Sequence, residues 1–353
     1  MERIVIVSAR VGAGHDGAAE ELARRYTARG RQVDRYDFLD LLPGRLGQLL
    51  CDSYHRQLQV APRSWDWLLG ALGSPPLSTA ARRFATLAGR ELRKVLTQDV
   101  SLVVSTYPLA THALAQLKRR GSLEAPFAVY LTDPAVHRLC VSRHADLHIA
   151  PNEIAREQAQ RLGALWTIVS DPVVAPGFRP VTGDLERADL RRKFGLPAEG
   201  RLALVLCGSW GIGEVERIAV DIAASGPVEP VVVCGRNDAL RAKLADAGVG
   251  HVFGWVKEMP ELMRACDLVV QNAGGLTTYE ALGSGLPVLT YRSLPGHGRA
   301  NAEVLDAAGV VPWVRDQADL PEALNWAITV TRKEIPEKIP EKISEEVPER
   351  IAG

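Results

Sequence analysis

The stretch RIVIVSARVGAGHDG, residues 3–17, decides the interpretation of the fold. An apolar run typical of a strand leads into a turn with glycines at 12, 14 and 17, and the sequence that follows is typical of a helix. The second half of the chain opens in the same way, with LALVLCGSWGIGE at 202–214. A strand followed by a glycine-rich turn and a helix is typical of a Rossmann-like unit. The sequence therefore predicts two such units.

Apolar runs alternate with helical stretches through both halves. The expected strands of the first half are residues 3–8, 31–37, 101–106, 127–132, 146–150 and 166–170. Those of the second half lie within residues 202–208, 229–235, 250–255, 267–275, 286–291 and 309–314. This alternation predicts parallel sheets and an α/β fold. We expect residues 1–174 and 175–331 to form two Rossmann-like domains, with the carboxyl ends of their strands facing a shared cleft.

Two segments depart from this pattern. Residues 38–100 are long for a crossover and contain Trp65 and Trp67, which do not share one helical face. We expect an additional packed pair of helices there, and the alternative is a surface that faces an acceptor or a membrane. Residues 332–353 repeat a charged four-residue unit with prolines, which predicts an extended or disordered tail.

Charge and cysteine content limit the class of protein. Lys+Arg and Asp+Glu are both 42, so no overall field attracts nucleic acid. The five cysteines are odd in number and lack a C-x-x-C pattern, which indicates reduced thiols. A strand begins at residue 3 without room for a signal peptide, and no apolar run reaches the roughly 18 residues of a membrane span. We expect a cytoplasmic protein, with peripheral membrane contact left open.

His15 lies between the second and third glycines of the first turn. At the carboxyl edge of a strand and near a helix N-terminus, a neutral imidazole can accept a proton. The alternative is a histidine that only caps the helix. Asp34 and Asp37 follow Gly17 at the distance where NAD enzymes hold a ribose, so an oxidoreductase is a rival interpretation.

The segment DLVVQNAGGLTTYEAL, residues 267–282, predicts an anion site in the second half. Its strand ends before Gly274 and Gly275, and a helix is expected from Leu276. Backbone N–H groups and the positive end of the helix dipole favour a phosphate or pyrophosphate. Glu280, one turn into the helix, can reach a ribose diol, although its carboxylate alternatively only stabilises the helix dipole.

These motifs resemble those of the GT-B glycosyltransferases of family 28. The resemblance is strongest to the monogalactosyldiacylglycerol synthase branch and weaker to the peptidoglycan GlcNAc transferase. It covers nearly all of residues 1–330 and is carried by GAGHDGAA at 12–19, LTDPAVHRL at 131–139, CGSWG at 207–211, the segment 254–282 and LPGHGRAN at 294–301.

The resemblance implies that the second domain binds a UDP-sugar carrying a hexose or N-acetylhexosamine, and that the first binds the acceptor. It implies His15 as the general base of an inverting transfer, with Gly14, Asp133 and His137 on the acceptor side. The implied donor-binding residues are Gly208, Ser209, Trp255, Val256, Gly274, Gly275, Leu276, Thr277, Thr278, Glu280, His297, Gly298 and Asn301.

Family members carry glutamine or glutamate residues in the loop that here contains His297, Gly298 and Asn301, so the sugar is left open. The chain has no Asp-x-Asp sequence, and we expect transfer without a metal or cofactor. The expected acceptor is a lipid such as diacylglycerol or a small molecule of specialised metabolism. Three alternatives stay open: a non-hydrolysing sugar-nucleotide epimerase, an NAD(P)-binding oxidoreductase and a non-catalytic nucleotide-sugar-binding subunit.

Overall fold

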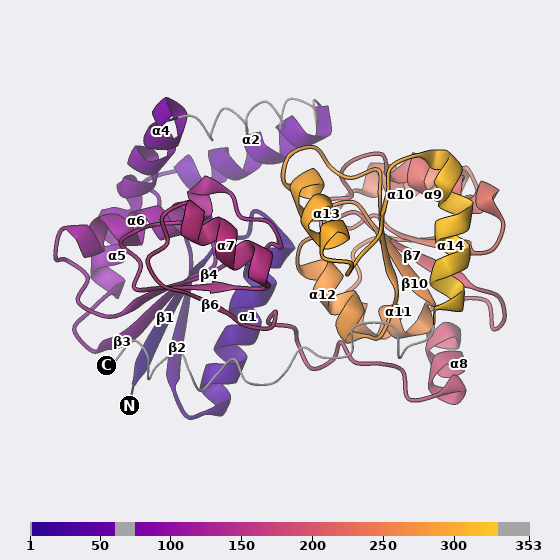
Figure 1. Cartoon of the computed structure of the whole chain (residues 1–353), viewed down its shortest axis with the longest axis horizontal. Coiled ribbons are helices and arrows are strands. Elements are labelled where there is room, and N and C mark those ends of the chain that lie inside the picture. The colour runs from indigo at the N-terminus through magenta and orange to yellow at the C-terminus, as the bar shows by residue number, and fades with distance from the viewer. Residues whose placement is uncertain (1, 61–74, 331–353) are drawn as a thin grey trace. The chain divides into compact units, whose positions relative to one another are not determined.

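The computed structural model describes residues 2–60 and 75–330. The chain forms two compact units, and the division lies between Val173 and Val174 (Figure 1). The division expected from the sequence falls after residue 174. Trp65, Trp67 and the expected tail at 332–353 lie outside the described residues.

The first unit is built on a six-stranded parallel sheet in the order β2-β1-β3-β4-β5-β6. Its strands are β1 (Arg3–Ser8), β2 (Gln32–Asp37), β3 (Val100–Ser105), β4 (Phe127–Tyr130), β5 (Leu147–Ala150) and β6 (Thr167–Val169). Each expected strand of the first half is present, which confirms the α/β prediction for this unit.

Helices cover both faces of the first sheet (Figure 1). Ile4 and Ile6 pack with α1 on one face, whereas Val5 and Val7 pack with α5 and α6 on the other, because successive side chains of a strand point to opposite faces. Both faces are apolar, as a parallel sheet requires. The helices are α1 (Ala13–Ala28), α2 (Leu46–Val60), α4 (Pro75–Ala85), α5 (Gly89–Val95), α6 (Pro108–Arg119) and α7 (Glu153–Arg161), with single turns η1 (Thr86–Ala88) and η2 (Arg138–Cys140).

The second unit has its own six-stranded parallel sheet, in the order β12-β11-β10-β7-β8-β9. Its strands are β7 (Leu202–Leu206), β8 (Glu229–Val233), β9 (His251–Phe253), β10 (Leu268–Gln271), β11 (Val288–Tyr291) and β12 (Trp313–Val314). All expected strands of the second half are present, so the fold class is confirmed for both units.

Helices also cover both faces of this sheet. Side chains of α9 and α14 pack on one face, and those of α8, α11 and α12 pack on the other. The helices are α8 (Asp184–Lys193), α9 (Val215–Ser225), α10 (Asp238–Asp246), α11 (Met259–Ala265), α12 (Leu276–Gly283), α13 (His297–Ala307) and α14 (Leu320–Thr329), with the turn η3 (Gln317–Asp319). No helix in the described part of the chain has the length and apolar character that crossing a bilayer requires.

Each sheet has one point at which the strand order reverses. In the first unit, β1 lies between β2 and β3; in the second, β7 lies between β8 and β10. Loops that leave the carboxyl ends of the strands at such a point run in opposite directions and open a crevice for a ligand. The loops after β1 and β3, and those after β7 and β10, are therefore the places to look for a site in each unit.

Candidate functional site

His15 lies at the strand reversal of the first unit. It is the third residue of α1, and the hydroxyl of Thr106, which follows β3, donates to the His15 carbonyl oxygen at 3.1 Å. The N-cap of α1 is Gly12 and no side chain caps this helix, so the His15 ring does not serve as a cap. A Cβ at Gly12 would have no heavy atom within 4 Å, so there is open space at the residue that begins this helix.

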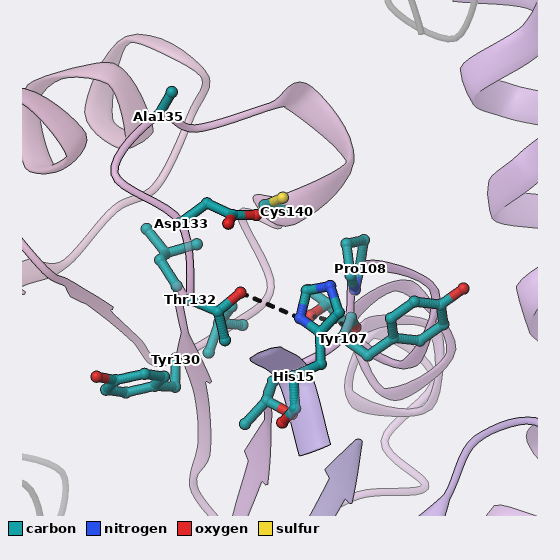
Figure 2. A pocket seen from close by; sticks show the side chains of 12 residues that line it. His15, Tyr107, Pro108, Tyr130, Thr132, Asp133, Ala135 and Cys140 are labelled. Atoms are coloured by element: carbon teal, nitrogen blue, oxygen red, sulfur yellow. Dashed lines mark hydrogen bonds between the residues drawn. The ribbon is translucent and has the colours of Figure 1, made fainter. Parts of the chain in front are cut away.

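Two side chains hold the His15 ring (Figure 2). Nδ1 lies 3.0 Å from the Oγ1 atom of Thr132, which follows β4. The Tyr107 ring packs edge-on, with centroids 5.5 Å apart and an interplanar angle of 74°. These three residues line one pocket together with Asp133 and Cys140. The loops after three neighbouring strands thus meet around one imidazole.

The acceptor-side residues of the prediction have different surroundings. Asp133 lines the His15 pocket, and Gly14 precedes His15 on α1. The side chain of His137 caps η2, because its Nδ1 accepts a hydrogen bond from the Leu139 backbone N–H at 3.2 Å. Burial, and then the negative charge of Asp133, raise the pKa of Cys140 to about 12, so this thiol stays protonated at neutral pH.

The carboxylates that suggested an NAD enzyme are engaged within the protein. Asp34 accepts from Arg3 Nε at 2.6 Å. Asp37 accepts from Arg10 Nη1 at 3.0 Å and from the Leu39 backbone N–H at 2.8 Å. Both side chains fix the β1–β2 edge of the sheet, and this does not favour the dinucleotide interpretation.

In the second unit, Gln271 shapes the loop between β10 and α12. Its Oε1 accepts from the N–H groups of Ala273 and Gly274, and its Nε2 donates to Thr290 Oγ1 at 2.8 Å. Gly274 has φ +74°, and a Cβ there would lie 2.7 Å from the Cβ of Asn301. Only glycine fits this loop without displacing α13.

The N-terminus of α12 carries unused donors. Among the described residues, no acceptor is found for the N–H groups of Gly275, Leu276 and Thr277. Such groups, together with the helix dipole, form an anion site. Gly274 belongs to the predicted phosphate loop, but its N–H is already bonded to Gln271, so the available donors begin one residue later.

The loop after β7 lies beside this helix N-terminus. Asn272 Nδ2 donates to the carbonyl oxygen of Ile212 at 2.8 Å, which ties the two loops together. The backbone N–H of Arg236 donates a hydrogen bond to the carbonyl oxygen of Ser209 at 2.9 Å. Gly208 is exposed and has open space around its Cα, so a ligand can approach the backbone closely.

Three of the predicted donor-binding residues lie beneath the loop rather than at its surface. The Asn301 amide, which is buried, donates to the Ala273 carbonyl oxygen at 2.9 Å. A Cβ at Gly298 would lie 2.8 Å from the Asn272 carbonyl oxygen, and Thr278 is fully buried. These residues shape the site from below, whereas His297, the first residue of α13, is partly exposed.

Glu280 is a partly buried carboxylate in α12. Burial raises its pKa to about 7, and no donor among the described residues stabilises the charged form. A ligand that brings hydroxyl donors to this carboxylate supplies the missing hydrogen bonds. A vicinal diol is such a ligand.

Trp255 takes part in an aromatic stack that the sequence did not predict. The Arg236 guanidinium lies 4.7 Å from the centre of the Trp255 ring and 5.4 Å from that of Trp210. Trp255 remains 48% exposed, while its neighbour Val256 packs against the core. The stack brings together the loops after β7, β8 and β9, and it offers a flat surface at the same edge of the sheet.

Sequence reasoning missed Thr132, Tyr107 and Gln271. Each lies at or just beyond the carboxyl end of a strand, next to a residue that the motifs did identify. The rule that ligands bind at the carboxyl ends of parallel strands would have identified all three as candidates.

Comparison with known proteins agrees with this architecture. Residues 202–350 match the model of the glycosyltransferase family 28 C-terminal domain. A protein of Bacillus cytotoxicus named processive diacylglycerol beta-glucosyltransferase is 22% identical in an alignment that covers 95% of this chain and 88% of the relative. A protein of the same name from Bacillus mycoides is 23% identical, over 90% of this chain and 83% of its own.

Solved structures show the same fold. MurG of Acinetobacter baumannii is 18% identical with a TM-score of 0.53, over 95% of this chain and 92% of that one. Anabaena HepE in complex with UDP-glucose is 16% identical with a TM-score of 0.58, over 93% and 90%. The protein is therefore a glycosyltransferase with the GT-B fold that carries the family 28 C-terminal domain.

Proposed function

We propose that this glycosyltransferase transfers glucose with inversion from UDP-glucose to a lipid hydroxyl, and that diacylglycerol is the acceptor. The N-terminus of α12, whose first N–H groups find no acceptor among the described residues, together with Glu280 one turn into the helix, is the observation that carries the proposal. The names of the relatives, diacylglycerol beta-glucosyltransferases, favour this sugar and this acceptor. A beta linkage formed from an alpha-linked nucleotide sugar requires inversion.

The second unit supplies the donor site in this proposal. The N–H groups of Gly275, Leu276 and Thr277 bind the diphosphate, and Glu280 accepts hydrogen bonds from the ribose diol. As the bond from C1 to the diphosphate breaks, negative charge grows on the leaving oxygen. Donors that are already in place at a helix N-terminus stabilise this charge without reorganisation. We therefore propose that the transfer needs no metal.

The first unit supplies the base. The acceptor hydroxyl binds in the pocket of His15 and Asp133, and Nε2 of His15 takes its proton. The acceptor oxygen then forms its bond to C1 from the face opposite the diphosphate, and UDP leaves with the bonding electron pair. General base catalysis of this kind contributes about 10²- to 10⁴-fold to the rate.

Calorimetric titration tests the donor site first. UDP and UDP-glucose should bind in the presence of EDTA, whereas NADH should not, and UDP-galactose and UDP-GlcNAc rank the sugars. Glu280→Ala should weaken UDP binding roughly ten- to 150-fold, because hydrogen bonds to a charged group contribute about 1.5–3 kcal/mol. Glu303→Ala, an exposed glutamate of α13, is the matched control. Binding of NADH alone would contradict the proposal.

Turnover tests the base and the acceptor. His15→Ala should reduce transfer to diacylglycerol about 10²- to 10⁴-fold and leave UDP binding intact. Wild-type turnover in this variant would remove His15 from the mechanism. Because diacylglycerol resides in a membrane, we also propose peripheral membrane contact, which co-sedimentation with vesicles containing diacylglycerol measures.

A further inference from the structure

Within the described ranges 2–60 and 75–330, the His15 imidazole is hydrogen-bonded at one nitrogen only. Nδ1 lies 3.0 Å from Thr132 Oγ1, and Figure 2 shows the second ring nitrogen on the side of the ring away from Thr132. The contact joins residues that are 117 positions apart in the chain, so it depends on the tertiary fold.

Thr132 is itself well fixed. The residue is 8% exposed and its side chain is β-branched, so its rotamers are restricted. It is the second residue after β4, and the preceding residue, Leu131, donates its backbone N–H to the Ile149 carbonyl oxygen at 2.9 Å. Its hydroxyl therefore occupies a defined position relative to His15.

A hydroxyl is both donor and acceptor, and the direction of the hydrogen bond decides what the ring can do. If Thr132 donates to Nδ1, the proton of the neutral ring lies on Nε2, and this nitrogen cannot act as a base. If Nδ1–H donates to Thr132, the lone pair of Nε2 is left for a substrate. Only the second arrangement suits proton abstraction in the pocket.

We infer that Thr132 is a positioning residue, which accepts a hydrogen bond from Nδ1–H and holds His15 in the tautomer whose Nε2 receives the acceptor proton. The inference rests on the proposed function, because it assumes that His15 is the base. The edge-on ring of Tyr107 restricts rotation of the imidazole, while Thr132 selects the tautomer.

A hydroxyl partner at Nδ1 of His15 has a different effect from a carboxylate. A carboxylate at this position would orient the ring and also stabilise its protonated form by charge. An uncharged hydroxyl orients the ring without that charge, so the proton taken from the acceptor is not held by an ion pair. Asp133, the neighbouring residue, lines the same pocket but is not the group at Nδ1.

The first test determines which tautomer His15 adopts. Two-bond ¹⁵N–¹H correlation spectra of histidine-labelled full-length protein distinguish Nδ1–H from Nε2–H, and the His15 signals are identified by their loss in His15→Gln. The wild type should show Nδ1–H. Thr132→Val, which keeps the side-chain shape, should shift the tautomer towards Nε2–H, and Thr132→Ser should restore it.

Kinetics provides the second test. Thr132→Val should lower kcat about two- to tenfold, the range expected for loss of one neutral hydrogen bond, with an unchanged KM for the UDP-sugar because the donor loops lie in the other unit. Thr132→Ser should recover most of kcat. A wild-type kcat in Thr132→Val, or no recovery in Thr132→Ser, would overturn the inference.

The two kinds of failure are distinguishable. Full turnover in His15→Gln overturns the base, and with it the role of Thr132. An Nε2–H tautomer in the wild-type protein overturns only the role of Thr132, because His15→Gln would still show the loss of turnover that the proposed function requires.

Discussion

Burial of Glu280 should make the second unit less stable as pH rises. The pKa of this carboxyl is about 7 in the folded protein, against an ordinary value of 4.5, because burial disfavours the charged form. Below pH 4.5 both the folded and the unfolded chain hold the proton, and Glu280 contributes nothing. Between pH 4.5 and 7 the unfolded chain has released the proton that the folded chain retains, so the free energy of unfolding falls. Above pH 7 the loss is constant.

The size of the effect follows from the shift. From 4.5 to about 7 is 2.5 pH units, and at about 1.4 kcal/mol per unit the cost for a fully buried carboxyl is about 3.5 kcal/mol. The side chain is only partly buried, so we expect about 2–3 kcal/mol. Glu280→Gln removes the ionisation and should be more stable than the wild type by this amount at pH 8, with little difference at pH 4.5.

Urea unfolding between pH 4.5 and 8, followed by tryptophan fluorescence, measures the difference between variant and wild type. Titrations elsewhere in the chain are common to both proteins and cancel in that difference. Glu303→Gln, an exposed glutamate in the same unit, should follow the wild type at every pH. Equal pH dependence in the wild type and Glu280→Gln from pH 5 to 7 would refute the burial argument.

Three further predictions concern stability. Gly274→Ala should destabilise the protein by about 2–5 kcal/mol, since it combines a left-handed φ with a Cβ 2.7 Å from Asn301. Gly309→Ala, at a residue with φ +65° and open space, should cost about 1–2 kcal/mol. Similar urea midpoints for the two variants would count against the contact with Asn301. Asp267→Asn should cost about 3–5 kcal/mol in the same assay, because the buried guanidinium of Arg191 loses its carboxylate partner at 2.8 Å. A cost below about 1 kcal/mol would show that the other hydrogen bonds of Arg191 are sufficient to stabilise its buried charge. Burial, and then the charge of Arg82, lower the pKa of His112 to about 4 from 6.5. The free energy of unfolding should therefore fall by about 2 kcal/mol between pH 7 and 5, because the unfolded chain gains the proton and the folded chain does not. His112→Gln should abolish this part of the pH dependence.

The sequence was sufficient to predict the strands, and the reason is visible in β7. LALVL at 202–206 is apolar at every position because both faces of the sheet are covered by helices, and all five side chains are buried. A continuous apolar run between turn residues is a strong signal for such a strand. The same reasoning applies to β1 and β10, whose carboxyl ends carry the residues of the two sites.

The contacts at the sites could not be predicted in this way. The bond between His15 and Thr132 depends on β4 following β3 in the sheet, and periodicity along the chain does not encode that order. Gln271 is a second case. The motif identified the glycines that follow Gln271. In the sequence, Gln271 is only the last residue of a strand, and nothing indicates that its side-chain oxygen accepts a hydrogen bond from the N–H of Gly274. Motifs identify which loops matter, whereas the roles of individual side chains depend on tertiary neighbours.

Glycines at the candidate sites of the two units have different physical surroundings. In the second unit, Gly274 is required by packing, since its φ is positive and a Cβ would strike Asn301. In the first unit, Gly12 has an ordinary extended backbone, and a Cβ there would meet nothing within 4 Å. Packing within the protein therefore does not explain a glycine at residue 12. In the proposed mechanism an acceptor hydroxyl approaches His15, the third residue of the helix whose N-cap is Gly12, and a glycine at this position adds no side chain to that approach.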